Sequence, residues 1–261
     1  MWTRALLKQN AKVAFHRNYF YCMLACLITS FLGGGVATIN LNVHNRNSGQ
    51  EMSLESFQQM MKEVELYMEQ IPRSLWMIVV FATVMGFLVG IGIAFFVSNV
   101  VMVGCNRYFL ENREHQTDVV KVFHNFQGGR FSSTVRTMFL RTLYIWGWSL
   151  LFWIPGIVKS YSYMMVPYIL AENTYLDSKR VFELSREMMR GHKWEAFVLN
   201  FSFFGWHWLS ALSGGLVGIF YVNPYINATY AEFYSAIKAE AKMKGLFAPH
   251  ELPGMGEPEI I

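Results

Sequence analysis

Four polar side chains fall inside apolar segments of the sequence, where they would meet hydrocarbon if those segments cross a membrane. Asn200 and His207 lie in a run from 196 to 221, and Asn227 and Glu232 lie in a run from 223 to 238. At 1.5 Å per helical residue, His207 is roughly 16 Å from the inner end of its run and Glu232 roughly 12 Å from the outer end of its own. In a hydrocarbon core about 30 Å thick these depths nearly coincide, so we expect the two side chains to face each other. The pair is either a proton or cation site or a structural polar clamp, and we favour the clamp because buried ionisable groups in membranes commonly pair with one another.

A second group of candidates is basic and lies where a membrane surface would be. Lysine and arginine at that level can bind anionic lipid headgroups, but snorkelling or the docking of a helix explains the same residues. The candidates are Lys159, beside several tyrosines, and Arg186, Arg190, His192 and Lys193 in a charged segment.

The sequence contains no pattern that indicates catalysis. It has no HExxH zinc motif, GxSxG elbow, phosphate-binding glycine loop or CxxC pair. Cys22 and Cys26 are four residues apart but have no neighbouring His or acidic partner for a metal, so packing explains them. We therefore assign no catalytic residue, metal or cofactor.

The composition indicates a membrane protein. Hydrophobic residues make up 53% of the 261 residues and charged residues only 15%, well below the quarter that is usual in soluble domains. The net charge of +4 is spread between the apolar runs. This pattern favours contact with anionic lipid over nucleic acid.

These segments predict an all-α fold, a polytopic membrane helical bundle with about six transmembrane helices and amphipathic interfacial helices. Pro155-Gly156 is expected to turn the chain between the third and fourth spans. A single membrane domain covers residues 1–245, followed by a disordered cytoplasmic tail at 246–261. The expected spans are 18–39, 75–98, 137–154, 157–172, 196–221 and 223–238, with an outer amphipathic helix at 51–71 and a cytoplasmic one at 177–191.

The basic residues predict the orientation. They concentrate in segments 1–17, 111–136, 177–193 and 238–244, whereas segment 40–73 is net acidic. The positive-inside rule places the basic side in the cytoplasm. We therefore expect a multi-pass protein of the cell membrane with both termini in the cytoplasm.

Five motifs between residues 154 and 234 resemble a known family. They read IPGIVKSYSY, PYILAEN, SREMMRGHKWEAF, NFSFFGW and NPYINATYAEFY. The family is a bacterial group of uncharacterised integral membrane proteins, domain-of-unknown-function family 975, and the resemblance extends over nearly the whole chain. Thr174 departs from the pattern, since such proteins often have proline there, and His207 does not belong to the motif. The resemblance implies a multi-span bacterial membrane protein and no particular activity.

Three functional hypotheses follow. The leading one is a non-catalytic membrane protein that binds membrane lipids, anionic at the cytoplasmic face, or a membrane protein partner or second copy of itself, and no nucleic acid. The first alternative is a small-solute or ion transporter with a polar site between the fifth and sixth spans. The second is a lipid-modifying membrane enzyme.

Overall fold

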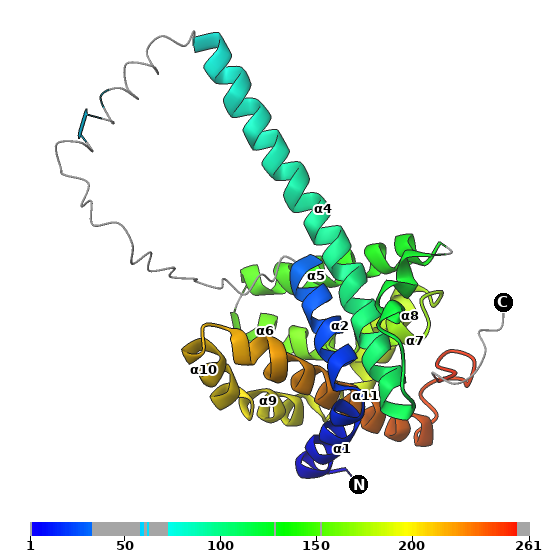
Figure 1. Cartoon of the computed structure of the whole chain (residues 1–261). Helices are drawn as coiled ribbons and strands as arrows, with labels where there is room; N and C mark the ends of the chain where they lie inside the picture. Colours follow the sequence, from blue (N-terminus) through cyan, green and yellow to red (C-terminus); the bar gives the residue numbers. More distant parts are fainter. Residues whose placement is uncertain are drawn as a thin grey trace. The chain divides into compact units, whose positions relative to one another are not determined.

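Every regular element that the structure describes is helical (Figure 1). The structure is a computed structural model that describes residues 2–32, 58–59, 62, 73–127, 129–151 and 153–254. The expected all-α class is therefore confirmed. The predicted outer helix at 51–71 lies almost wholly outside the described residues. The chain divides into one compact unit of residues 1–39 and 95–261 and another of residues 40–94.

α4 (Arg73–Glu114) is the longest helix and contains the stretch best suited to a membrane. Among the described residues, its segment Leu75–Glu114 is the one helix long and apolar enough to cross a bilayer, judged by length and composition, and none of its most apolar window is buried. The second half of the helix, from Phe95, belongs to the larger unit. The other predicted spans are shorter or less apolar helices.

α2 (Tyr19–Leu32) packs antiparallel to the C-terminal half of α4. Asn18 lies 2.9 Å from Asn112, and Cys22 lies 3.5 Å from the Tyr108 hydroxyl. The start of the predicted span 18–39 therefore lies beside residues 108–112 of α4, which are beyond the end of the predicted span 75–98. The sequence did not predict this offset, because hydropathy fixes the length of each run but not its register against another.

α1 (Arg4–Arg17) lies along α11 (Asn223–Met243) in the opposite direction. The rings of Trp2 and Phe233 are 5.3 Å apart at one end of the contact, and those of Phe15 and Tyr221 are 5.5 Å apart at the other. Thr3 caps α1 by accepting a hydrogen bond from the Leu6 backbone. The basic N-terminal segment is thus part of the folded bundle.

α5 (Arg130–Leu151) and α6 (Trp153–Ser162) form a helical hairpin, which α7 (Val166–Glu172) continues after a short break. The prediction that Pro155-Gly156 turns the chain was wrong, because both residues lie inside α6. A Cβ on Gly156 would lie 2.3 Å from the Ser149 hydroxyl oxygen. Gly156 is therefore needed for the close approach of the two helices. In the break after α6, Arg141 donates to the carbonyl of Tyr163 at 3.0 Å.

α8 (Ser178–Met188) lies within the segment 177–191 that was predicted to be an amphipathic helix. The side chain of Asp177 accepts a hydrogen bond from the Lys179 backbone, and the apolar face, including Val181 and Leu184, is buried. Gly191, with a φ of +91°, lies in the connection to the next helix.

Earlier in the chain, the 3-10 helix η1 (Val119–Phe126) packs directly against α4. A Cβ on Gly104 would be only 1.8 Å from the Val122 carbonyl oxygen.

The predicted fifth span is divided into α9 (Lys193–Phe201), α10 (Phe204–Leu212) and the π-helical η2 (Gly218–Val222). The chain reverses at Gly214 and Gly215, whose φ angles are +64° and +90°. η2 then packs on α10 and runs directly into α11. The turn between the fifth and sixth predicted spans therefore lies roughly two helical turns before the expected boundary, and η2 belongs with the sixth.

Candidate functional site

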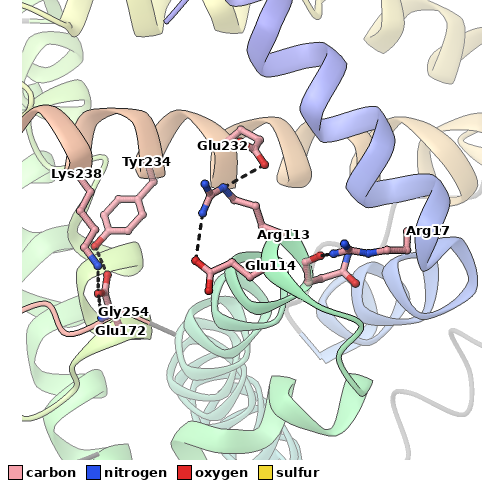
Figure 2. Close-up of polar contacts among 9 residues, drawn as sticks. Arg17, Arg113, Glu114, Glu172, Glu232, Tyr234, Lys238 and Gly254 are labelled. Atoms are coloured by element: carbon pink, nitrogen blue, oxygen red, sulfur yellow. Dashed lines mark hydrogen bonds and ion pairs between the residues drawn. The ribbon is translucent and has the colours of Figure 1, made fainter. Parts of the chain in front are cut away.

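Charged side chains gather where α4 ends beside α11 (Figure 2). Arg113 on α4 lies between two carboxylates, with its Nε 3.1 Å from Glu232 and a terminal nitrogen 3.4 Å from Glu114. Glu232 is only 8% exposed, so Arg113 supplies the charge that compensates its burial. The Nε atom makes no aligned hydrogen bond, so its contact with Glu232 is an ion pair alone.

Glu172, at the end of α7, is a second buried carboxylate at this end of the bundle. It pairs with Lys238, accepts a hydrogen bond from the Tyr234 hydroxyl at 2.8 Å, and accepts another from the backbone nitrogen of Gly254 at 2.7 Å. Two side chains of α11 and one backbone nitrogen of the C-terminal segment thus satisfy one carboxylate. The cation that compensates Glu172 is thus a lysine of α11.

The C-terminal segment, residues 246–254, is bound to the bundle by polar contacts. The guanidinium of Arg180 on α8 forms a bidentate pair with Glu251, at 2.7 and 3.1 Å, and Asn173 donates to the Glu251 carbonyl at 3.1 Å. The hydrogen bond from Arg180 lowers the pKa of Glu251. Phe247 and Leu252 are buried. The prediction of a disordered tail from residue 246 is therefore wrong up to residue 254, and residues 255–261 lie outside the described part.

Asn18, at the corner between α1 and α2, organises a third polar cluster. Its amide nitrogen is 2.9 Å from the Asn112 side-chain oxygen, 3.0 Å from the Thr117 carbonyl and 3.2 Å from the Tyr108 hydroxyl. Arg17 beside it donates to the Asn112 carbonyl. Sequence reasoning missed this cluster, because Asn18 was taken as the first residue of a span. An asparagine between a basic segment and an apolar run was the available signal.

Two pockets flank Arg113. The Lys242 pocket has a volume of about 220 Å³, and Leu110, Arg113, Glu114, Glu172, Tyr234, Ser235, Lys238, Ala239, Lys242 and Gly254 line it. The Arg17 pocket, about 290 Å³, is lined by Asn10, Val13, Ala14, Arg17, Arg113 and Glu232. The site is thus a layer of charged side chains, most of them in ion pairs, with two small pockets beside Arg113.

The four residues of the predicted intramembrane site have different surroundings. Glu232 pairs with Arg113, and His207 is exposed on α10. Asn200 donates to the Tyr161 hydroxyl at 3.4 Å, and Asn227 donates to the sulfur of Cys26 at 3.3 Å. The structure therefore brings Glu232 to an arginine that the sequence had assigned to a cytoplasmic connector.

The predicted headgroup contacts also differ from one another. Arg186 and Arg190 are exposed on and just after α8, and Lys193 is partly buried at the start of α9. His192 lies between two carboxylates, 2.7 Å from Glu195 and 3.2 Å from Glu240. The ammonium of Lys159 lies 4.7 Å above the ring of Trp148, a cation–π distance. Arg186 and Arg190 are thus the two predicted headgroup contacts whose side chains are exposed.

The described residues contain no cluster of three or more His, Cys, Asp or Glu that could hold a metal ion, and their three cysteines are buried free thiols. Among the described residues, the buried carboxylates are each paired with a cation: Glu111 with Arg107, Glu172 with Lys238 and Glu232 with Arg113. The arrangement is suited to holding the helices together and to binding an anion between them.

The family model described as "Protein of unknown function (DUF975)" matches residues 5–241. The chain belongs to the DUF975 family. No curated protein and no solved structure matches it. The DUF975 match ends just before the C-terminal segment, so the contacts of Glu251 and Gly254 lie outside the region that the family model covers.

Proposed function

We propose that this protein is a non-catalytic, multi-span protein of the bacterial cell membrane that binds lipid or partner proteins. The observation that carries the membrane assignment is the first half of α4. Five consecutive residues, Met77 to Phe81, are each more than half exposed, with Met77 at 69% and Phe81 at 67%. Consecutive exposed residues cover every side of a helix, and a helix that is apolar all round needs an apolar environment.

Other helices support several spans rather than one. α9 and α10 carry a row of aromatic rings in which the first four stack on one another and the last meets its neighbour edge-on, and all are at least 40% exposed. The row consists of Trp194, Phe197, Phe201, Phe204 and Trp208. Large aromatic surfaces of this kind are stable against lipid. The proposed spans are α2, α4, α5, α6 with α7, α9 with α10, and η2 with α11.

The proposed orientation places the charged layer in the cytoplasm, in accordance with the positive-inside rule. Four basic residues from four separate helices make polar contacts in this layer: Arg17 with Asn112, Arg113 with Glu232, Arg180 with Glu251 and Lys238 with Glu172. Exposed Arg186 and Arg190 then face the anionic cytoplasmic leaflet. The pairing of Glu232 with Arg113 leaves no observation in the described residues that favours the transport alternative.

The membrane assignment is tested by extraction of cell membranes with alkaline carbonate. A protein with several spans stays in the pellet and needs detergent for release, whereas recovery in the aqueous supernatant would contradict the proposal. Lipid binding is tested by native mass spectrometry of the purified protein with phosphatidylglycerol. Arg186→Gln with Arg190→Gln should lower the number of retained lipids. The matched control, Lys62→Gln with Arg73→Gln, removes two charges from the predicted outer side and should retain them.

Flux tests the transport alternative. Proteoliposomes that hold the purified protein should show no uptake or efflux of small ions above empty vesicles. Flux that disappears in Glu232→Gln would replace the binding proposal with transport.

A further inference from the structure

The Lys242 pocket is lined by three cations, Arg113, Lys238 and Lys242, and by two carboxylates, Glu114 and Glu172, which leaves an excess of one positive charge. Lys238 and Lys242 are four residues apart on α11, and Arg113 faces them from α4. Lys238 is compensated by Glu172, and Arg113 is compensated by Glu232 and Glu114. Lys242 forms no ion pair within the described part of the chain. Because like charges four apart on a helix repel each other, an anion between the two lysines would stabilise this end of α11.

The pocket also offers neutral hydrogen-bond donors. The hydroxyl of Ser235 lines it, one helical turn from Lys238 and on the same side of α11. The Tyr234 hydroxyl is already used by Glu172, so Ser235 is the hydroxyl free to donate to a ligand. Two ammonium groups, a guanidinium and a hydroxyl together match the acceptor oxygens of a phosphate group.

The size of the pocket limits the ligand. At about 30 Å³ for each water of the liquid, 220 Å³ holds roughly seven waters. That volume encloses a phosphate and the first atoms of its substituent, and the rest of a larger ligand would lie outside the open pocket. We propose that the Lys242 pocket binds the phosphate group of a small phosphate ester, with Lys242, Lys238, Arg113 and Ser235 as its ligands. This site is separate from the two exposed arginines of α8.

Two sources present this chemistry, a lipid headgroup and a soluble phosphorylated compound. The distance along α4 distinguishes these two sources, because Arg113 lies 15 residues, roughly 22 Å, beyond residue 98, where the expected span ends. A headgroup reaches the pocket only if the bilayer extends farther along α4 than that span. The experiment therefore needs one arm for each source.

The full-length protein, purified in detergent, is titrated with glycerol 3-phosphate by calorimetry. In parallel, it is placed in nanodiscs with and without phosphatidylglycerol, and bound lipid is identified by mass spectrometry. We expect binding in one arm, with one ligand per chain, and that arm identifies the source. Absence of binding in both arms would overturn the proposal.

Variants connect the binding to the pocket. Lys242→Gln should weaken it roughly tenfold, the loss expected for one charge-assisted hydrogen bond. Lys244→Gln is the matched control, because Lys244 is two residues away, is exposed and pairs with Glu240 instead. Equal affinity in wild type and Lys242→Gln, or equal losses in both variants, would overturn the assignment.

Arg113 needs a compensated variant, because removing it alone leaves buried Glu232 without a partner. Arg113→Gln combined with Glu232→Gln removes both charges of the pair. The double variant should bind at least tenfold more weakly while its melting temperature stays near that of the wild type. Unchanged affinity in a folded double variant would exclude Arg113 from the site, and if this variant fails to fold, Lys242→Gln and its control decide the proposal alone.

Discussion

Replacing Gly104 by alanine tests the packing of η1 on α4. Gly104 is in the middle of a helix, where alanine is ordinarily more stable than glycine by about 1 kcal/mol. Here the added Cβ would lie 1.8 Å from the carbonyl oxygen of Val122 and 2.7 Å from its carbonyl carbon. These are backbone atoms, which cannot rotate away as a side chain can, so η1 or α4 must shift.

The magnitude follows from the two opposing effects. Overpacking in a well-packed core typically costs about 1–3 kcal/mol, and a backbone clash this close belongs at the upper end. After the gain in helix propensity, Gly104→Ala should be destabilised by roughly 2 kcal/mol. In a chain of this size that corresponds to a fall in melting temperature of about 4 °C or more.

Gly147→Ala is the matched control for this measurement. Gly147 is also in a helix interior, but a Cβ there would meet no atom within 4 Å. It should therefore be as stable as the wild type or slightly more so. Thermal unfolding of the detergent-solubilised variants, followed by intrinsic fluorescence, compares the two. Equal melting temperatures for Gly104→Ala and Gly147→Ala would refute the reasoning that η1 lies in contact with α4.

Three further variants test the charged end of the bundle. Because Arg180 lowers the pKa of Glu251, the stability from this pair is fully present above the unfolded carboxyl pKa of about 4.3 and is lost as pH falls through the lower folded pKa. Glu251→Gln should therefore unfold about 1 kcal/mol more easily at pH 7, with a smaller deficit at pH 3, and an equal deficit at both pH values would contradict this. Glu172→Gln, which leaves Lys238 without its carboxylate, should be less stable than the double variant with Lys238→Met, and the opposite order in thermal unfolding would show that the pair is not coupled. Asn18→Leu should lose roughly 1–3 kcal/mol in denaturant unfolding because its acceptors lose their donor, and an unchanged midpoint would mean that water replaces it.

Helices were predictable from the sequence wherever one physical signal acts locally. The amphipathic period located α8 closely, and long apolar runs located α4 and α5. Pro155-Gly156 was misread because both residue types favour turns, while here glycine serves the contact with Ser149. Whether a glycine turns the chain or admits a neighbouring helix depends on tertiary packing, which a single sequence does not display.

Partners in the charged layer were not predictable for the same reason. Glu232 was assigned to His207 by equal depth along two ideal spans, but the chain reverses at Gly214 and Gly215, which changes the register of both. Glu251 was read as part of a disordered tail because its neighbourhood is rich in proline and acid. Its binding depends on Arg180, 71 residues earlier, and no local pattern indicates so distant a contact.

The most direct test of the proposed membrane topology is to determine on which side of the membrane α8 lies. The three native cysteines are replaced by alanine, and Glu183, which is exposed on α8, is changed to cysteine for labelling with a membrane-impermeant maleimide. A second variant carries Ser48→Cys in the segment expected outside. We expect Glu183→Cys to be labelled in inverted membrane vesicles but not in intact cells, with the reverse for Ser48→Cys. Labelling of Glu183→Cys in intact cells would contradict the proposed threading of the chain through the membrane.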